Sequence, residues 1–316
     1  MIIVYAKAGA RMEHQEGAEA LERIERERIV WIDLVSPEEQ EVKAVEAFIG
    51  SELMTPTDAA EIESSSRFYD DQLEIQLNAH FLQPADKGLR PEAVTFALRN
   101  NVLITRRNGP LRSFTELDRR RKAYPNQTWT GYDTFISLFD LRIDFDADLV
   151  EQMAREIAQL NKDISLNTAV GKPLLLRIDE LLDKAMLLRA NIVDKQRTLG
   201  ALLKSEGFPA THRNGIRTLL RDIDSLLEHI TFGFERLEFL QNTAMGLVNI
   251  DQNKVIKIFT VATVVFMPPM LIASIYGMNF RHMPELGQQW GYPLALALMV
   301  VSAALTLLYF SRKKWL

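Results

Sequence analysis

Two long stretches without a charged side chain, both near the end of the chain, constrain the fold more than any other feature. No residue carries a formal charge from Ile258 to Phe280, and none does from Leu286 to Ser311. An apolar helix of about 20 residues crosses the roughly 30 Å hydrocarbon core of a membrane. The connection between the two stretches is too short to hold a domain. The sequence therefore predicts a membrane hairpin that follows a long water-soluble portion.

Basic residues flank this hairpin and predict its orientation. Lys254 and Lys257 precede the first span, and Arg312, Lys313 and Lys314 follow the second. Segments rich in Lys and Arg stay on the cytoplasmic side, so we expect a multi-pass protein of the cell's inner membrane, in contact with lipid, with both termini in the cytoplasm. Aromatic residues stand at the expected interfaces, namely Trp290, Tyr292, Tyr309 and Trp315.

Composition and motifs exclude several classes of function. The net charge of −5 argues against nucleic acid as a partner, and we expect the one basic run, residues 119–122, to lie on a solvated helix face. The chain has no cysteine, so disulfides and thiol catalysis are excluded. The histidines are scattered, and neither a glycine-rich phosphate loop nor a nucleophile elbow is present. We therefore expect no enzymatic activity and no organic cofactor.

The soluble portion begins with a pattern typical of an α/β domain. Residues 30–35 predict a buried strand, residues 73–81 a half-buried strand and residues 93–98 and 102–105 a hairpin across Asn100-Asn101. Ser36 is the expected N-cap of a helix that begins at Pro37 and is closed by a capping box with Glu39. A second helix start is expected at residues 55–58.

From Tyr132 onward the pattern is helical. Apolar residues recur at helical spacing from Leu149 to Ile164, and again from Leu176 to Leu199 after a break at residues 171–173. No proline occurs between Thr211 and Pro268, so one helix can continue from the stalk into the first span. A single helix of that length needs packing partners, which are either the preceding helices or other copies of the chain.

These patterns predict an α+β membrane protein in three parts. Residues 1–130 form a cytoplasmic α/β domain, residues 131–253 a helical stalk and residues 254–316 two C-terminal transmembrane helices. The expected spans are residues 255–276 and 291–311, joined by an outer loop of residues 277–290.

Polar and methionine side chains recur along one face of the first span, in the order Asn253, Thr260, Thr263, Met267, Met270 and Ser274. Two interpretations fit this stripe. The hydroxyl groups can hydrogen-bond backbone carbonyls or a neighbouring helix in an ordinary packed bundle. Alternatively, one such helix from each subunit lines a pore, with the methionines as a hydrophobic constriction. The pair Pro268-Pro269 should bend or loosen the helix under either interpretation.

The motif after the first span favours the second interpretation. The segment Tyr276-Gly277-Met278-Asn279-Phe280 ends that span, and Met283-Pro284-Glu285-Leu286 follows in the loop. In this arrangement the chain closely resembles the CorA family of magnesium channels, whose signature is the Gly-Met-Asn tripeptide. The resemblance includes four further segments, at residues 31–34, 221–224, 253–259 and 266–269, and therefore covers essentially the whole chain.

The resemblance implies a homopentamer whose first spans line the pore and whose second spans form an outer ring. Asn279 then stands at the outer pore mouth, with Gly277 and Met278 completing the selectivity loop. The implied pore face also contains Asn253 and Ile256, and Met267 is a constriction residue. Mg²⁺ would be both the transported and a regulatory ion, with Co²⁺ and Ni²⁺ as further candidate substrates, entering down the membrane potential.

In the family, cytoplasmic Mg²⁺ bound between subunits closes the pore, and Asp222 with Asp86 are the positions implied here. Two departures concern the pore: Met270 replaces a usual threonine, and Arg281 with His282 follow the motif, so that Glu285 alone would attract cations in the loop. Two other hypotheses stay open, which are a zinc transporter similar to ZntB and a membrane-tethered scaffold that conducts nothing.

Overall fold

The computed structural model describes residues 1–9, 11–55, 68–71, 73–85, 88–124, 129–166, 171–279 and 283–313, apart from the side chains of Glu285 and Leu286. The chain divides into two compact units. The first consists of Met1–Thr168 and Leu175–Leu240, and the second of Ala169–Leu174 and Gln241–Leu316. The two units are described separately below.

The first unit is built on a seven-stranded mixed sheet with the order β2-β1-β3-β7-β6-β5-β4. Strand β3 pairs with β7 in parallel, and the other neighbours are antiparallel. The strands are β1 (Ile2–Ala8), β2 (Arg11–Glu16), β3 (Ile29–Val35), β4 (Phe68–Asp71), β5 (Glu74–Pro84), β6 (Leu89–Arg99) and β7 (Val102–Arg107).

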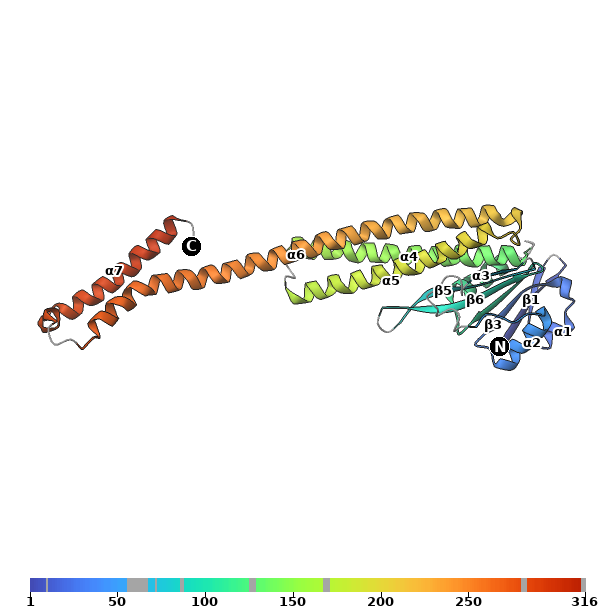
Figure 1. Cartoon of the computed structure of the whole chain (residues 1–316), viewed down its shortest axis with the longest axis horizontal. Helices are drawn as coiled ribbons and strands as arrows, with labels where there is room; N and C mark the ends of the chain where they lie inside the picture. The colour runs from blue at the N-terminus through green and yellow to red at the C-terminus, as the bar shows by residue number, and fades with distance from the viewer. Residues whose placement is uncertain are drawn as a thin grey trace. The chain divides into compact units, whose positions relative to one another are not determined.

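Short and long helices complete the described chain (Figure 1). The short ones are α1 (Ala20–Arg23), η1 (Arg26–Arg28), α2 (Glu39–Ile49), α3 (Arg112–Ala123), η4 (Ala210–His212) and η5 (Pro284–Gly287). The long ones are α4 (Gly131–Ser165), α5 (Lys172–Lys204), α6 (Arg213–Tyr276) and α7 (Gly291–Arg312). The predicted continuous helix into the first span is therefore confirmed as α6, which contains Pro268 and Pro269.

The predicted hairpin is confirmed as β6 and β7, which pair in antiparallel register. Asn100 and Asn101 form its two-residue turn with φ of 48° and 68°, the left-handed conformation that asparagine tolerates better than most residues. The start of α4 lies against this turn, because Gly131 N–H donates to the carbonyl of Asn101 at 2.9 Å. A Cβ atom at Gly131 would lie only 2.5 Å from that carbonyl oxygen, so the contact requires glycine.

The strand predicted at residues 73–81 is confirmed as β5, but it is covered on both faces and not half-buried as predicted. Its polar residues Glu74, Gln76 and Asn78 expose 5%, 4% and 0% of their surface. Their partners are internal: Gln76 donates to the carboxylate of Glu74 at 2.9 Å, and Asn78 accepts from the hydroxyl of Thr95 at 2.6 Å. Alternation of polar and apolar residues indicated solvent, whereas here it reflects a hydrogen-bonded interior.

The helix after β3 begins two residues later than predicted, with Glu38 rather than Ser36 as its N-cap. The N–H of Glu38 donates to the carboxylate of Glu41 at 2.9 Å, and the same carboxylate accepts from the N-terminal ammonium of Met1 at 2.6 Å. That contact with the chain terminus holds the pKa of Glu41 below its usual range. The second predicted helix start, at residues 55–58, extends beyond the described residues.

The prediction that the basic run at residues 119–122 lies on a solvated helix face is wrong for one of its four residues. Arg121 exposes only 6% of its surface, and its guanidinium lies over the rings of Tyr5 and Trp31 at 4.6 and 5.4 Å. Burial lowers its pKa to about 10. Its three neighbours in the run remain partly or largely exposed, so α3 uses one arginine for packing and the others for solvation.

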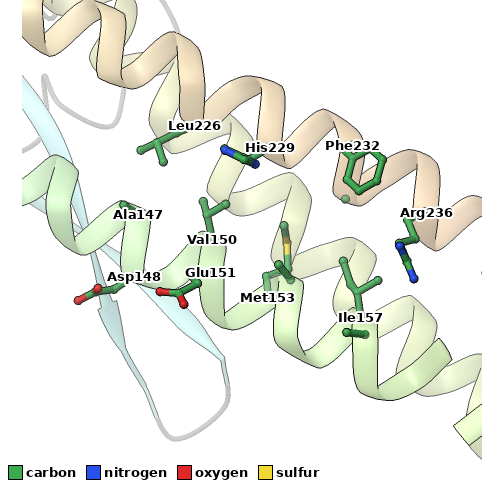
Figure 2. A pocket seen from close by; sticks show the side chains of 13 residues that line it. Ala147, Asp148, Val150, Glu151, Met153, Ile157, Leu226, His229, Phe232 and Arg236 are labelled. Carbon is green, nitrogen blue, oxygen red and sulfur yellow. The ribbon is translucent and has the colours of Figure 1, made fainter. Parts of the chain in front are cut away.

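Helices α4, α5 and the first part of α6 lie side by side along the first unit (Figure 1). The predicted apolar faces are mostly confirmed, since Met153, Ile157, Leu188 and Ile192 are buried, although Leu176 is 52% exposed. Figure 2 shows a groove of about 590 Å³ where α4 meets α6, lined by Met153 and Ile157 from α4 and by Leu226 and Phe232 from α6.

A buried ionic cluster joins α4 to α5 and to the sheet. The Asp146 carboxylate lies 3.1 Å from Lys195 Nζ and 3.1 Å from Arg142 Nε, while Arg142 also donates to the carbonyl of Leu82 at 2.8 Å. Burial lowers the pKa of Lys195 to about 8. Burial alone would raise the pKa of Asp146, but Lys195 and Arg142 outweigh it and the pKa is lowered.

In the second unit, α7 packs against the last part of α6. Val261, Val265 and Phe310 form a small buried cluster with Val264 and Ala303 beside it. Both helices are long and apolar enough to cross a membrane, and only 11% of each apolar window is buried inside the chain. Most of their apolar surface is therefore exposed in a single copy of the chain.

Candidate functional site

The residues predicted to line a pore lie on the face of α6 that α7 leaves uncovered. At 100° per residue, Thr263 and Met270 stand about 140–180° around the helix axis from Val261 and Val265, which contact α7. Every predicted lining position on α6 is exposed in the single chain, namely Asn253, Ile256, Thr260, Thr263, Met267, Met270 and Ser274. Met267 and Met270 expose 59% and 69% of their surface.

The hydroxyl groups on this face are satisfied within α6 itself. Thr260 donates to the carbonyl of Ile256 at 2.8 Å, and Thr263 donates to that of Phe259 at 2.9 Å. Each hydroxyl oxygen keeps free lone pairs, because a hydroxyl has one donor and two acceptor positions. The stripe therefore needs no neighbouring helix to satisfy its donors, and it still presents oxygen acceptors outward.

The prolines change the backbone of α6 without ending the helix. Neither Pro268 nor Pro269 has an N–H, so the carbonyls of Val264 and Val265, four residues earlier, lose their usual helical donors. The helix nevertheless continues to Tyr276. These two carbonyls lie inside the predicted span, where water is scarce.

The Gly277-Met278-Asn279 segment closes the last turn of α6. Gly277 N–H donates to the carbonyl of Ala273 at 2.9 Å, and Met278 N–H donates to that of Ile275 at 3.2 Å. The φ of Gly277 is not positive, so the glycine is not required for a left-handed turn. The space beside it is tight, because a Cβ atom would lie 3.1 Å from the Ala273 carbonyl oxygen and this neighbour would have to shift by a few tenths of an ångström. Asn279 follows as an exposed residue after the helix.

The loop beyond Asn279 is only partly described. Residues Phe280, Arg281 and His282 lie outside the described residues, as does the side chain of Glu285. The described part of the loop contains the short helix η5, and α7 begins at Gly291.

The two predicted regulatory positions have different outcomes. Asp86 lies outside the described residues, and Asp222 is exposed on α6. Burial raises the pKa of Asp144 on α4, and the charges of Asp140, Asp148 and Asp222 raise it further. Asp222 therefore faces an acidic stripe on α4 that consists of Asp140, Asp144 and Asp148. The sequence prediction missed this stripe, although the i, i+4, i+8 spacing of its aspartates could have indicated it. The described residues contain no group of three or more side chains placed to hold a metal ion.

The fold and the exposed stripe on α6 define a class of protein: a two-span membrane protein with a soluble α/β domain and a helical stalk that continues into its first span. The chain belongs to the CorA-like Mg²⁺ transporter family, whose model matches residues 26–313.

Several curated relatives are similar over most of their length. The chain is 39% identical over 293 residues to the magnesium transport protein CorA of Wolinella succinogenes, with 91% of each chain covered. It is 36% identical over 290 residues to the protein of the same name from Escherichia coli strain K12, with 91% of this chain and 92% of that protein covered.

Solved structures show the same fold. The complete structure of the CorA magnesium transporter from Methanocaldococcus jannaschii matches with a TM-score of 0.85 at 18% identity, covering 100% of this chain and 99% of that one. The ZntB cytoplasmic domain from Vibrio parahaemolyticus matches with a TM-score of 0.59 at 12% identity, over 79% of this chain and 98% of that domain.

Proposed function

We propose that this chain is the subunit of a magnesium channel of the inner membrane, in which several copies surround one pore. The observation that carries the proposal is the exposed, uncharged face of α6 that ends in Gly277-Met278-Asn279. The pore would be lined by this face from each copy, and α7 would form the outer layer because it covers the opposite side of α6. The names and extent of the curated relatives support magnesium as the substrate.

A ring of asparagine amides suits the chemistry of magnesium. Mg²⁺ dehydrates reluctantly and keeps several waters of an octahedral shell, so selection of the hydrated ion avoids the cost of stripping it. The amide oxygen of Asn279 can accept hydrogen bonds from those waters. A neutral ring holds the ion more weakly than carboxylates would, which lets it leave and conduct. Met267 and Met270 would form apolar constrictions further along the same face.

The membrane potential supplies the driving force in this proposal. A divalent cation that moves inward across about 100 mV gains roughly 4–5 kcal/mol, so neither a nucleotide nor an organic cofactor is needed, and the protein has no enzymatic role. The proposal places both termini in the cytoplasm, because Lys254, Lys257 and Arg312 flank the spans on one side. Co²⁺ and Ni²⁺, which are divalent cations like Mg²⁺, are further candidate substrates.

Exposed aromatic residues on the first part of α6 support self-association of the soluble portion of the chain as well. Phe232 and Phe239 expose 61% and 65% of their surface in the single chain, and Phe232 lines the groove shown in Figure 2. A monomer rarely leaves large apolar groups along one face uncovered unless a partner covers them. A homopentamer is the assembly that the family resemblance implies.

We further propose that cytoplasmic Mg²⁺ closes the pore at a site that includes Asp222, with Asp86 as a second ligand. Carboxylate oxygens suit Mg²⁺, and Asp222 already contributes to the negative field that raises the pKa of Asp144. Carboxylates that face one another between copies would repel until a divalent ion neutralises them. Loss of the ion would then favour separation of the copies and an open pore.

Zinc transport of the ZntB type remains the main alternative. The chain is 12% identical to the ZntB domain and 39% identical to a curated magnesium transport protein. This difference in identity favours magnesium. A scaffold that conducts nothing is the second alternative. It gives no role to the Gly277-Met278-Asn279 segment that follows the uncharged face of α6.

Ion flux into proteoliposomes tests the proposal. The full-length protein is reconstituted and the uptake of Mg²⁺, Co²⁺, Ni²⁺ and Zn²⁺ is compared under an inside-negative potential. We expect Mg²⁺ uptake, and we expect Asn279→Ala to abolish it without changing the mass of the oligomer. Gln288→Ala, which removes an amide elsewhere in the same loop, is the matched control and should conduct normally. Zn²⁺ uptake alone, or normal Mg²⁺ uptake by Asn279→Ala, would contradict the proposal.

The regulatory part has its own test. Internal Mg²⁺ is titrated while the flux of the reconstituted protein is recorded, and Asp222→Ala should need several-fold more Mg²⁺ for closure. Asp224→Ala is the control, since the carboxylate of Asp224 accepts from Gln196 at 2.6 Å within the chain. A wild-type dose response in Asp222→Ala would remove Asp222 from the site and leave the conduction proposal intact.

A further inference from the structure

A second cavity, within the second unit, lies between α6 and α7 and has a strongly uneven distribution of charge. Its volume is about 640 Å³, and two lysines on α6, Lys254 and Lys257, stand at one end. The remaining lining is apolar and consists of Ile258, Val261, Ala262, Val265 and Phe266 from α6 with Leu307 from α7. We call this cavity the α6–α7 groove.

The length of the groove matches one leaflet of a membrane. Lys257 and Phe266 are nine positions apart on a continuous helix, which corresponds to roughly 14 Å along its axis. Half of a hydrocarbon core of about 30 Å is about 15 Å. The lysines therefore stand at the level of the lipid headgroups when the apolar part of the groove lies at the depth of one set of acyl chains.

The two lysines differ in their partners. Lys254 Nζ lies 3.0 Å from the carboxylate of Asp251, one turn earlier on the exposed surface of α6. Lys257 has no ion-pair partner among the described residues. A positive charge at the headgroup level thus stands uncompensated at the mouth of an apolar groove, and an anion of the membrane is its natural partner.

We propose that the α6–α7 groove binds an anionic phospholipid, with one acyl chain between the helices and the phosphate at Lys257. The acyl chain fills a space that would otherwise leave the lining without packing partners. Because the groove and the lipid interior are equally apolar, selectivity among lipids comes from the headgroup and the lysines. The inference rests on the membrane placement of α6 and α7 and is independent of the ion that the protein carries.

A helix from a second copy fits the groove less well. Copies related by rotation about an axis along the membrane normal place identical residues at the same depth. A neighbour would therefore carry Lys254 and Lys257 at the depth of the groove's mouth against a single carboxylate, Asp251, so that its net charge there is positive and repels Lys257. A phospholipid brings a negative phosphate to that level instead.

Native mass spectrometry of the full-length protein tests the headgroup contact. Phosphatidylglycerol and phosphatidylcholine with identical acyl chains are titrated against the detergent-solubilised oligomer. We expect phosphatidylglycerol to bind more tightly, and we expect Lys257→Gln to weaken it about fivefold, as removal of one lysine near a charged surface should. Lys257→Arg should bind normally, and Lys313→Gln is the matched control at the same membrane end outside the groove.

Two outcomes of this titration would overturn the inference. One is equal affinity for the two phospholipids, and the other is an equal loss of affinity in Lys257→Gln and Lys313→Gln, which would indicate a general attraction to the basic end of the hairpin. Neither outcome changes the expectation for Mg²⁺ flux, so the two proposals fail separately.

Photocrosslinking identifies the occupant directly. The chain has no cysteine, so Ala262→Cys can carry a single benzophenone label in the groove. Illumination in vesicles that contain both phospholipids should attach one phospholipid molecule to each labelled chain. Phosphatidylglycerol should make up a larger share of these adducts than of the vesicle lipid. The same label at Ala297→Cys, an exposed position on α7 outside the groove, should follow the bulk composition. Adducts formed only with a second copy of the chain would refute lipid binding.

Discussion

In the buried ionic cluster of α4 and α5, removal of Asp146 and removal of Lys195 should reduce stability by unequal amounts. Lys195 and Asp146 expose 0% and 1% of their side chains, and Arg142 also contacts the Asp146 carboxylate. Two cations thus share one carboxylate. Asp146→Asn takes the shared carboxylate from both buried cations and leaves Lys195 with the weaker attraction of Asp194. Lys195→Met instead leaves a balanced pair of Arg142 and Asp146.

The expected magnitudes follow from this count of charges. Removal of one partner that leaves an uncompensated buried charge costs about 3–5 kcal/mol, so Asp146→Asn should lower the unfolding midpoint by roughly 6–20 °C. Lys195→Met should cost less, since it removes a buried charge and adds apolar packing, with a loss of about 1–2 kcal/mol for the hydrogen bond to Asn191. Lys184→Met, which breaks a more exposed pair with Glu156, should cost at most about 1 kcal/mol.

The pH dependence gives a second, independent test. The pKa of Lys195 is about 8 in the folded chain against an ordinary value of 10.5. Between these values the unfolded chain holds a proton that the folded chain has lost, so the contribution of this group to stability rises with pH. Asp146→Asn removes the carboxylate that holds the Lys195 pKa up, so the folded variant deprotonates at lower pH. Its deficit relative to wild type should therefore narrow as the pH rises to about 8.

Thermal unfolding of the full-length protein in detergent, followed by tryptophan fluorescence from pH 6 to 9, measures both effects. The reasoning would be refuted by equal losses in Asp146→Asn and Lys195→Met. It would also be refuted by an Asp146→Asn deficit that does not change with pH. Lys195→Met has no titrating group at this position, so its difference from wild type should be flat below about pH 7. Above about pH 8 the wild type alone gains stability from this group, and the difference should shift in favour of the wild type.

Two pairs of glycine substitutions test contacts of the backbone. Gly277→Ala should move the end of α6 by a few tenths of an ångström and reduce Mg²⁺ flux several-fold. The control is Gly287→Ala, whose new Cβ meets nothing within 4 Å and which should conduct normally. Equal fluxes of the two variants in reconstituted vesicles would contradict the close-contact argument. Gly131→Ala should destabilise the soluble unit by about 3 kcal/mol or more because its Cβ meets rigid backbone. Gly200→Ala, inside α5 with open space around it, should stabilise it by about 0.5–1 kcal/mol; the same sign for both in thermal unfolding would be evidence against this account.

Features that depend on neighbouring residues in the chain could be predicted from the sequence. The two apolar helices, the long helix into the first span and the Asn100-Asn101 hairpin all follow from local composition or local backbone preference. The stripe on α6 is also local, since helical spacing alone puts Thr263 and Met270 on one face.

The burial predictions that were wrong concern side chains whose environment depends on segments distant in the sequence. Gln76 and Asn78 look solvated in the strand pattern, yet other strands and loops cover them. Arg121 belongs to a basic run, yet it packs on Tyr5 and Trp31, which come from β1 and β3.

The sequence by itself determined that two uncharged helices end the chain and that Asn279 follows the first, because hydropathy and motif are properties of consecutive residues. The tertiary structure alone decided which face of α6 stays uncovered, that Asp222 meets the acidic stripe of α4, and that Lys195 and Asp146 share a dry interior. Those outcomes depend on the packing of helices far apart in sequence, and burial then sets whether a charge is solvated, paired or left for a ligand.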